Sequence, residues 1–276
     1  MKKHLSTILL VAVLVVGLGL LLYPSVSDYW NSFHQSRAIA SYTEELAALD
    51  TSEQDRLLAD AKAYNLELQG KANPFVFTEE EDAAYRKQLS LREEGGGVIG
   101  DIQIPKINVD LPIYLGTDES VLQIGVGHVE GSSLPVGGKS THTVLSGHRG
   151  LPSAKLFTDL NLVSEGDVFL LKILGETLTY EVDRILIVEP NDTREIGIVN
   201  GEDYCTLITC TPYGINSHRI LVRGHRIENQ EAESILNVQS EAARIDPIMV
   251  APFAAIPLLL LLGIVLMVST GRRKKR

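Results

Sequence analysis

The chain has 276 residues, of which 45% are hydrophobic, and it carries a formal net charge of −10 at pH 7. Seven of its 25 basic residues lie in two short terminal segments without acidic residues, so the part between them has 18 basic against 35 acidic residues. This balance excludes nucleic-acid binding as the main function, because such binding requires a basic surface. The same part is long enough for one globular domain with a sizeable core.

Both ends of the chain are strongly apolar. Leu5 to Tyr23 and Ile248 to Val268 each approach the length of about 20 residues that a membrane-spanning helix needs, although Pro252 and Pro257 interrupt the second. Basic residues stand at the outer end of each span, and basic flanks stay in the cytoplasm. We therefore predict a two-pass protein of the cell membrane, with both termini cytoplasmic and the middle outside. The alternatives are a cleaved signal peptide for the first span and a buried core helix for the second.

Helical patterns follow the first span. Leucines recur at near-helical spacing over residues 30–69, and Asp50 introduces a break with a new N-cap. We expect the two resulting helices to form a stalk above the membrane. Thr78 is expected to cap a third helix over residues 79–91, and a glycine-rich hinge follows at 93–97.

From residue 98 the apolar period changes to two, which is typical of strands. The expected strands are 98–104, 109–114, 141–146, 168–174, 177–188, 204–210 and 219–227. Many short strands separated by glycine-rich turns predict a mainly β domain, either a closed barrel or a sandwich. The predicted organisation is a cytoplasmic tip and first anchor (1–23), a helical stalk with a loop (24–97), the β domain (98–227), a helical linker (228–247), and a second span with a basic tail (248–276).

The two cysteines, Cys205 and Cys210, lie in one expected strand. Residues five apart on a strand point to opposite faces, and their Cα atoms are too far apart to form a disulfide. A free cysteine is most often a small buried hydrophobic residue, and we assign that role to Cys205. Cys210 ends its strand at the rim of the sheet, where binding groups usually lie, and it is the candidate nucleophile.

Two further residues could assist a cysteine nucleophile. Arg219 begins the next expected strand, where antiparallel pairing would bring it beside Cys210, and a guanidinium can stabilise a thiolate or an oxyanion. His148 leaves its strand through a glycine-flanked turn, and an imidazole supplies the acid and base that such a nucleophile needs. The alternatives are a salt bridge at the rim for Arg219 and simple exposure for His148. Competing histidines are His128, His142, His218 and His225, and no cluster has convincing zinc-ligand spacing.

These motifs resemble those of the sortases. The resemblance rests on the run Thr206 to Cys210, on Arg219, and on the Ser-Gly-His-Arg-Gly run around His148. The two spans and the Asn-Pro-Phe loop resemble class C, the pilus-assembling sortases of Gram-positive bacteria. The similarity covers roughly Leu46 to Arg226 and both anchors. It implies an eight-stranded sortase barrel with N-terminal helices and a lid loop, flanked by two transmembrane helices, with Cys210, His148 and Arg219 as the catalytic residues and no cofactor or metal.

The resemblance also implies a reaction. Sortases cleave an LPxTG-like sorting signal between Thr and Gly and pass the acyl group to an amine, which in class C is a lysine side chain of the next pilin. The expected partners are therefore pilin subunits and the membrane, and no nucleic acid. Two rival functions remain open: a cell-wall cysteine peptidase that uses water as acceptor, and a membrane-tethered assembly module without enzymatic activity.

In class C the lid over the active site carries an Asp-Pro-aromatic motif. The corresponding positions here are Asn73, Pro74 and Phe75, so the aspartate is replaced. An aspartate could pair ionically with the catalytic arginine, whereas Asn73 can form only a neutral hydrogen bond. We therefore expect a lid that is held less tightly. Without the resemblance, this tripeptide would be interpreted as an ordinary turn with one buried ring.

Overall fold

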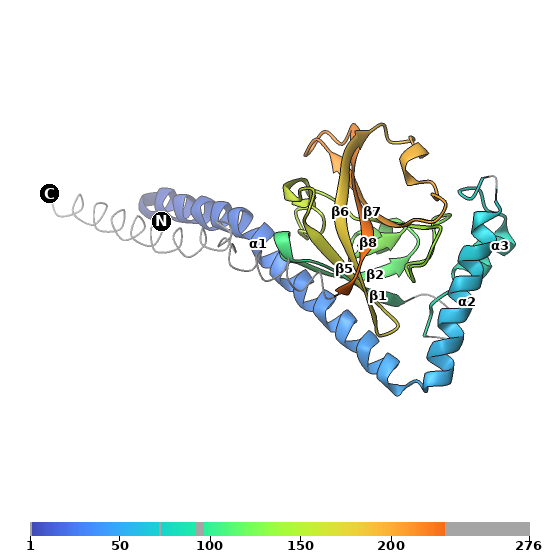
Figure 1. Ribbon diagram of the computed structural model, residues 1–276. Helices are drawn as coiled ribbons and strands as arrows, with labels where there is room; N and C mark the ends of the chain where they lie inside the picture. The colour runs from blue at the N-terminus through green and yellow to red at the C-terminus, as the bar shows by residue number, and fades with distance from the viewer. Residues whose placement is uncertain (1, 72, 92–96, 230–276) are drawn as a thin grey trace. The chain divides into compact units, whose positions relative to one another are not determined.

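The computed structural model describes residues 2–71, 73–91 and 97–229 of the chain (Figure 1). The chain divides into two units, with the described residues up to Ser27 in one and those from Asp28 onward in the other. The predicted linker, apart from its first two residues, and the predicted second span lie outside the described residues.

Helix α1 (Lys2–Ala48) runs without interruption through Pro24. The composition changes from apolar to mixed near this proline, where the sequence predicts the end of the anchor rather than the end of a helix. A helix depends on its backbone hydrogen bonds rather than on uniform composition, and one proline removes a single donor. The apolar part of α1 is the one segment within the described residues that is long and apolar enough to cross a membrane.

Helix α2 (Thr51–Gln69) begins at the predicted cap, where the Asp50 side chain accepts a hydrogen bond of 2.8 Å from the amide of Glu53. The helix docks on the barrel. The amide side chain of Asn65 is buried, donates to the carbonyl of Leu134 at 3.1 Å and accepts from its amide at 2.7 Å. One side chain thus satisfies both polar groups of a buried backbone residue.

Helix α3 (Glu79–Tyr85) begins at Thr78, which forms the predicted cap together with Glu81. It is shorter than the predicted 79–91. The chain leaves the helix after Tyr85, and Leu89 adopts a positive φ of 54° that turns its side chain into the core. Burial of the Tyr85 and Leu89 side chains therefore stabilises the chain more than continuation of the helix would.

The β domain is a closed barrel with the strand order β1-β2-β3-β4-β7-β8-β6-β5. Its strands are β1 (Val98–Ile104), β2 (Val109–Leu115), β3 (Val126–His128), β4 (Thr141–Ser146), β5 (Val168–Ile173), β6 (Glu176–Val188), β7 (Asp203–Thr211) and β8 (His218–Ile227). Short helical turns connect them: η1 (Pro105–Ile107), α4 (Glu119–Leu122), η2 (Leu160–Leu162) and η3 (Arg194–Ile196). The barrel, rather than a sandwich, is the outcome of the two predicted alternatives.

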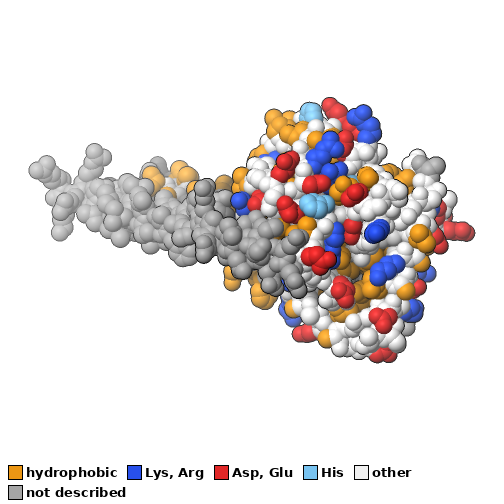
Figure 2. All heavy atoms as spheres, in the orientation of Figure 1, with side chains coloured by type: hydrophobic (Ala, Val, Ile, Leu, Met, Phe, Trp, Pro, Cys, Tyr) orange, Lys and Arg blue, Asp and Glu red, His pale blue; other side chains and the backbone are white. Residues whose placement is uncertain are grey.

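Strand β7 has two apolar faces. Its inward residues Cys205 and Leu207 belong to the main core. Its outward residue Ile208 packs in a second set of side chains, which we call the outer-face cluster: Val144, Ile196 and Leu221, with Phe75, Val129, Leu186, Val188 and Ile208 against them. Acidic and basic side chains are interspersed over the face of the barrel seen in Figure 2.

Candidate active site

Cys210 and Arg219 are direct partners across the antiparallel pair β7–β8. Residues opposite each other in such a pair project from the same face, with Cβ atoms about 4.5–5.5 Å apart. Ile208 lies two residues before Cys210 and Leu221 lies two residues after Arg219, so each shares a face with its neighbour, and both belong to the outer-face cluster. Cys210 and Arg219 therefore stand on the outer face of the barrel, at the end of the strands, and both are partly exposed.

Cys205 is fully buried in the main core, and both cysteines are free thiols. The predictions of opposite faces and of no disulfide are confirmed. Burial raises the pKa of Cys205 well above its ordinary value. Because the thiolate is the reactive form, Cys205 is unsuited to act as a nucleophile.

Neighbouring strand β4 brings His148 to the same end of the sheet. β4 runs parallel to β7, and the amide of Gly147 donates to the carbonyl of Ile208 at 3.1 Å. The hydroxyl of Thr209 in turn donates to the carbonyl of Gly147 at 2.7 Å. A Cβ at position 147 would lie 2.7 Å from the ring of Phe157, so the glycine before His148 is needed for close packing.

In the part of the chain that the structure describes, the Arg219 guanidinium is not neutralised by an acidic group. Its Nη1 donates to the backbone carbonyls of Asn216 at 3.3 Å and His218 at 3.1 Å. Within residues 2–71, 73–91 and 97–229, no carboxylate pairs with it. The positive charge is therefore available to stabilise the Cys210 thiolate or an oxyanion that forms beside it.

Two competing histidines belong to buried hydrogen-bond networks. His128 contacts the Tyr85 hydroxyl through Nδ1 at 2.8 Å and the Ser133 carbonyl through Nε2 at 2.9 Å, and burial lowers its pKa to about 4. His142 contacts Thr206 through Nε2 at 2.7 Å, and burial also lowers its pKa. His218 lies 3.5 Å from the carboxylate of Glu189, while His225 is opposite Tyr204 at the far end of β7. His148 and His218 both lie at the Cys210 end of the sheet, but His218 pairs with Thr211 and therefore projects from the face opposite to Cys210 and Arg219. His148 is thus the better candidate for the catalytic histidine.

The Asn-Pro-Phe loop lies over the strands that carry the site. The backbone of Pro74 and Phe75 packs against Gly131, where a Cβ would collide with it. The Phe75 ring packs in the outer-face cluster, which includes Ile208 and Leu221. Asn73 is exposed and makes no hydrogen bond within the described part of the chain.

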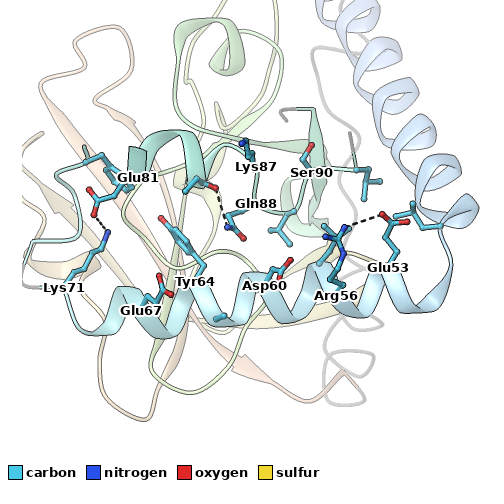
Figure 3. A pocket seen from close by; sticks show the side chains of 17 residues that line it. Glu53, Arg56, Asp60, Tyr64, Glu67, Lys71, Glu81, Lys87, Gln88 and Ser90 are labelled. Carbon is cyan, nitrogen blue, oxygen red and sulfur yellow. Dashed lines mark hydrogen bonds and ion pairs between the residues drawn. The ribbon is translucent and has the colours of Figure 1, made fainter. Parts of the chain in front are cut away.

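One ion pair and one cavity were not anticipated from the sequence. Lys71 and Glu81 form an ion pair of 2.7 Å that closes the base of the Asn-Pro-Phe loop, and they also line a cavity of about 650 Å³ between α2 and α3 (Figure 3). The residues around Cys210 do not line this cavity. Among the described residues, no group of three or more His, Cys, Asp or Glu side chains could hold a metal ion.

Arg149 and Glu119 are further neighbours of the site that sequence reasoning missed. Arg149 directly follows His148, and this adjacency was a usable signal. Glu119 is 29 positions upstream, too far for any local pattern to connect them. Its Oε2 lies 3.5 Å from Nε2 of His148, and that nitrogen has no hydrogen-bond partner among the described residues. The hydrogen bond from Gln123, together with the nearby imidazole, lowers the pKa of Glu119.

Comparison with known proteins gives a consistent result. Residues 102–227 match the family described as Sortase domain. Sortase D of Bacillus subtilis is 33% identical over 145 residues, which cover 51% of this chain and 70% of that protein. The crystal structure of sortase C1 from Streptococcus agalactiae is 49% identical with a TM-score of 0.67, covering 70% of this chain and 98% of the other. Streptococcus pneumoniae sortase C is 45% identical with a TM-score of 0.61, covering 70% and 97%.

Proposed function

We propose a pilin-joining activity for this chain, which belongs to the sortase family of cysteine transpeptidases. In this activity the enzyme cleaves an LPxTG-like sorting signal of one pilin subunit and joins the acyl group to a lysine amine of the next. The observation that carries the proposal is the pairing of Cys210 with Arg219 across β7 and β8. Further support comes from Streptococcus pneumoniae sortase C, whose structure bears on pilin substrate specificity.

The first half-reaction forms a thioester. The thiolate of Cys210 attacks the Thr carbonyl carbon, and the carbonyl oxygen becomes negative. Arg219, which has no carboxylate partner among the described residues, donates to that oxygen and stabilises the tetrahedral intermediate. His148 gives a proton to the departing Gly nitrogen, and the C–N bond breaks.

The second half-reaction transfers the acyl group. The lysine amine attacks the thioester carbonyl, His148 accepts a proton from the attacking nitrogen, and the C–S bond breaks with its electron pair returning to sulfur. The neutral imidazole left by the first half-reaction is the base that this step requires. No step in this sequence needs a metal or an organic cofactor.

We propose that the Asn-Pro-Phe loop is a lid that limits access to Cys210. The packing of Phe75 in the outer-face cluster supports this, and so does the similarity to S. agalactiae sortase C1, which has been studied as a lid mutant. Neutral Asn73 has no partner in the described residues, so the apolar ring is the main attachment of the lid.

The membrane topology is also proposed. The apolar part of α1 supports an N-terminal anchor. The second span at 248–268, the cytoplasmic position of both termini and the domain boundaries at 23, 97, 227 and 247 stay predictions from the sequence. In this arrangement the catalytic barrel is extracytoplasmic, where sorting signals and acceptor pilins are presented.

One experiment tests the function. The purified chain is mixed with an LPxTG-like peptide, with and without a lysine-containing acceptor, and the products are weighed by mass spectrometry. We expect an acyl-enzyme on Cys210 in both cases, and an isopeptide-linked product when acceptor is present. An enzyme that releases only the free acid in the presence of excess acceptor would be a hydrolase. Absence of both products would contradict an enzymatic role in sorting.

A further inference from the structure

An exposed carboxylate lies beside the imidazole of His148. Glu119 belongs to α4, its side chain is 72% exposed, and its Oε2 is 3.5 Å from Nε2 of His148. Among the described residues it is the one carboxylate within 4 Å of that ring. No lysine or arginine in the same residues pairs with it, whereas its neighbour Asp118 is paired with Arg86 at 3.1 Å.

The orientation of Glu119 is fixed by its own helix. The amide of Gln123, four residues later, donates to Oε1 of Glu119, which leaves Oε2 directed at His148. A carboxylate oxygen only accepts hydrogen bonds, and an imidazole nitrogen without a proton also only accepts. With His148 in that neutral form, the buried Nε2 has no hydrogen-bond partner and Oε2 has no lysine or arginine partner among the described residues. A cation with several N–H groups inserted between the two atoms would bond both.

We propose that Glu119 is the residue that recognises the acceptor, by binding the ammonium group of the incoming lysine next to His148. The inference rests on the proposed function, because it assumes that the acceptor is a lysine. A lysine ammonium has three donors on a compact charge, so it can bond the carboxylate and the imidazole together. Acidic residues are common over this chain, but Glu119 is distinguished by its contact with the base.

The proton balance assigns each group a task. Bound at Glu119, the lysine ammonium releases one proton to water and becomes a free amine. Its nitrogen attacks the thioester carbonyl, a C–N bond forms, the C–S bond breaks, and His148 accepts the second proton. The cysteine thiolate and the imidazolium are thereby restored for the next sorting signal. Glu119 forms no covalent bond and undergoes no net change of charge.

A different role for Glu119 would be to orient the imidazole, as a carboxylate does in a Ser-His-Asp triad. In that arrangement the carboxylate is buried and fixes the tautomer of the ring. Glu119 is largely exposed, so the acceptor role suits its environment better. The two roles differ in outcome, because an orienting residue affects both half-reactions and an acceptor-binding residue affects only the second.

The experiment measures the two half-reactions separately on the full chain in detergent. The first is acyl-enzyme formation without acceptor, and the second is the KM for a lysine peptide and for hydroxylamine, which is largely uncharged at neutral pH. For Glu119→Gln we expect the lysine KM to rise about fivefold at low salt, with a smaller rise at high salt. The hydroxylamine KM and the acyl-enzyme rate should stay within about twofold. Glu119→Asp should recover part of the loss, and Glu119→Lys should exceed it.

Glu189 provides a matched control. Its side chain is 74% exposed and lies 3.5 Å from His218, so Glu189→Gln removes the same charge from an equivalent contact with a different histidine. We expect it to leave the lysine KM unchanged. An unchanged lysine KM in Glu119→Gln would overturn the proposal, and so would an equal loss in both half-reactions or an equal effect of Glu189→Gln. If wild-type protein forms no acyl-enzyme, the proposed function itself fails, and this inference fails with it.

Discussion

Arg149 donates a hydrogen bond of 3.2 Å to the hydroxyl of Thr211, so the residue after His148 is fixed to the residue after Cys210. The same guanidinium donates to Asn161 at 2.7 Å and lies 5.9 Å above the Tyr213 ring. We predict that Arg149→Ala lowers kcat/KM about tenfold, because small displacements of a catalytic group are costly. Arg149→Lys keeps the charge without the planar fork and should recover little. Acyl-enzyme rates and melting temperatures measured together would test this, and a normal rate in a stable variant would contradict it.

The environments of the two cysteines lead to opposite predictions. Cys210→Ala should abolish acyl-enzyme formation and pilin polymerisation. Cys205→Ala should keep most activity and cost about 1 kcal/mol of stability, because it removes only one buried sulfur atom. Mass spectrometry after brief treatment with a thiol reagent should find modification at Cys210 alone. Comparable loss of activity in both folded variants would refute the assignment of the nucleophile.

Arg219 is predicted to be sensitive to the geometry of its charge. Arg219→Lys should reduce turnover by at least about 100-fold, the scale of one lost oxyanion donor. Arg219 also donates to the backbone carbonyls of Asn216 and His218. A lysine at this position can donate to the same carbonyls, so the variant should keep the loop in place. Single-turnover acylation rates are the suitable measurement. Near-normal rates would mean that Arg219 serves mainly structure.

The lid is predicted to depend on the Phe75 ring. In a Cys205→Ala background, Phe75→Ala should speed alkylation of Cys210 by a bulky thiol reagent by about tenfold, because the ring loses its packing against the outer-face cluster. Asn73→Asp should slow the reaction by adding a charged partner for Arg219. Val76→Ala is the matched control, since Val76 lies in the same loop but is exposed. If Phe75→Ala leaves the labelling rate unchanged, the loop is an ordinary turn.

His128 predicts a dependence of stability on pH. Burial lowers its pKa from 6.5 to about 4, so below pH 6.5 the unfolded chain binds a proton that the folded chain does not. Stability therefore falls as the pH drops, by about 2 kcal/mol between about pH 7.5 and about pH 5 from this group. His128→Gln should reduce this pH dependence in thermal unfolding, even if the variant is less stable throughout. His225→Gln, at a partly exposed position, is the control, and equal slopes in wild type and His128→Gln would contradict the prediction.

Periodicity predicted most of the barrel and the opposite orientations of Cys205 and Cys210. The side chains of a strand alternate between its two faces, so residues five apart point to opposite faces, and β7 has a core face and an outer face. Strand β3 escaped prediction because three residues, Val126–His128, are too few to establish a period. It is nevertheless the strand that leads to His128, whose contact with Tyr85 fixes the end of α3.

The contacts that surround the candidate site could not be predicted in the same way. Glu119 meets His148 and Lys71 meets Glu81 only because the chain folds back on itself. Glu119, Lys71 and Glu81 are charged side chains in polar segments, where a solvated position is the ordinary expectation. The contact of Arg149 with Thr211 is an exception, because it follows from the pairing of β4 with the neighbouring strand β7.

The position of Phe75 has a consequence for how substrates gain entry. The Phe75 ring packs against the outer-face cluster as a bound ligand would, but a short loop attaches the ring permanently to the protein. A tethered ring of this kind competes with the substrate for the outer-face cluster at an effective concentration on the order of millimolar. This concentration does not depend on the amount of enzyme present. A dilute free peptide would then be excluded most of the time. A pilin confined to the same membrane would reach a high local concentration and displace the ring, so that proximity selects the substrate.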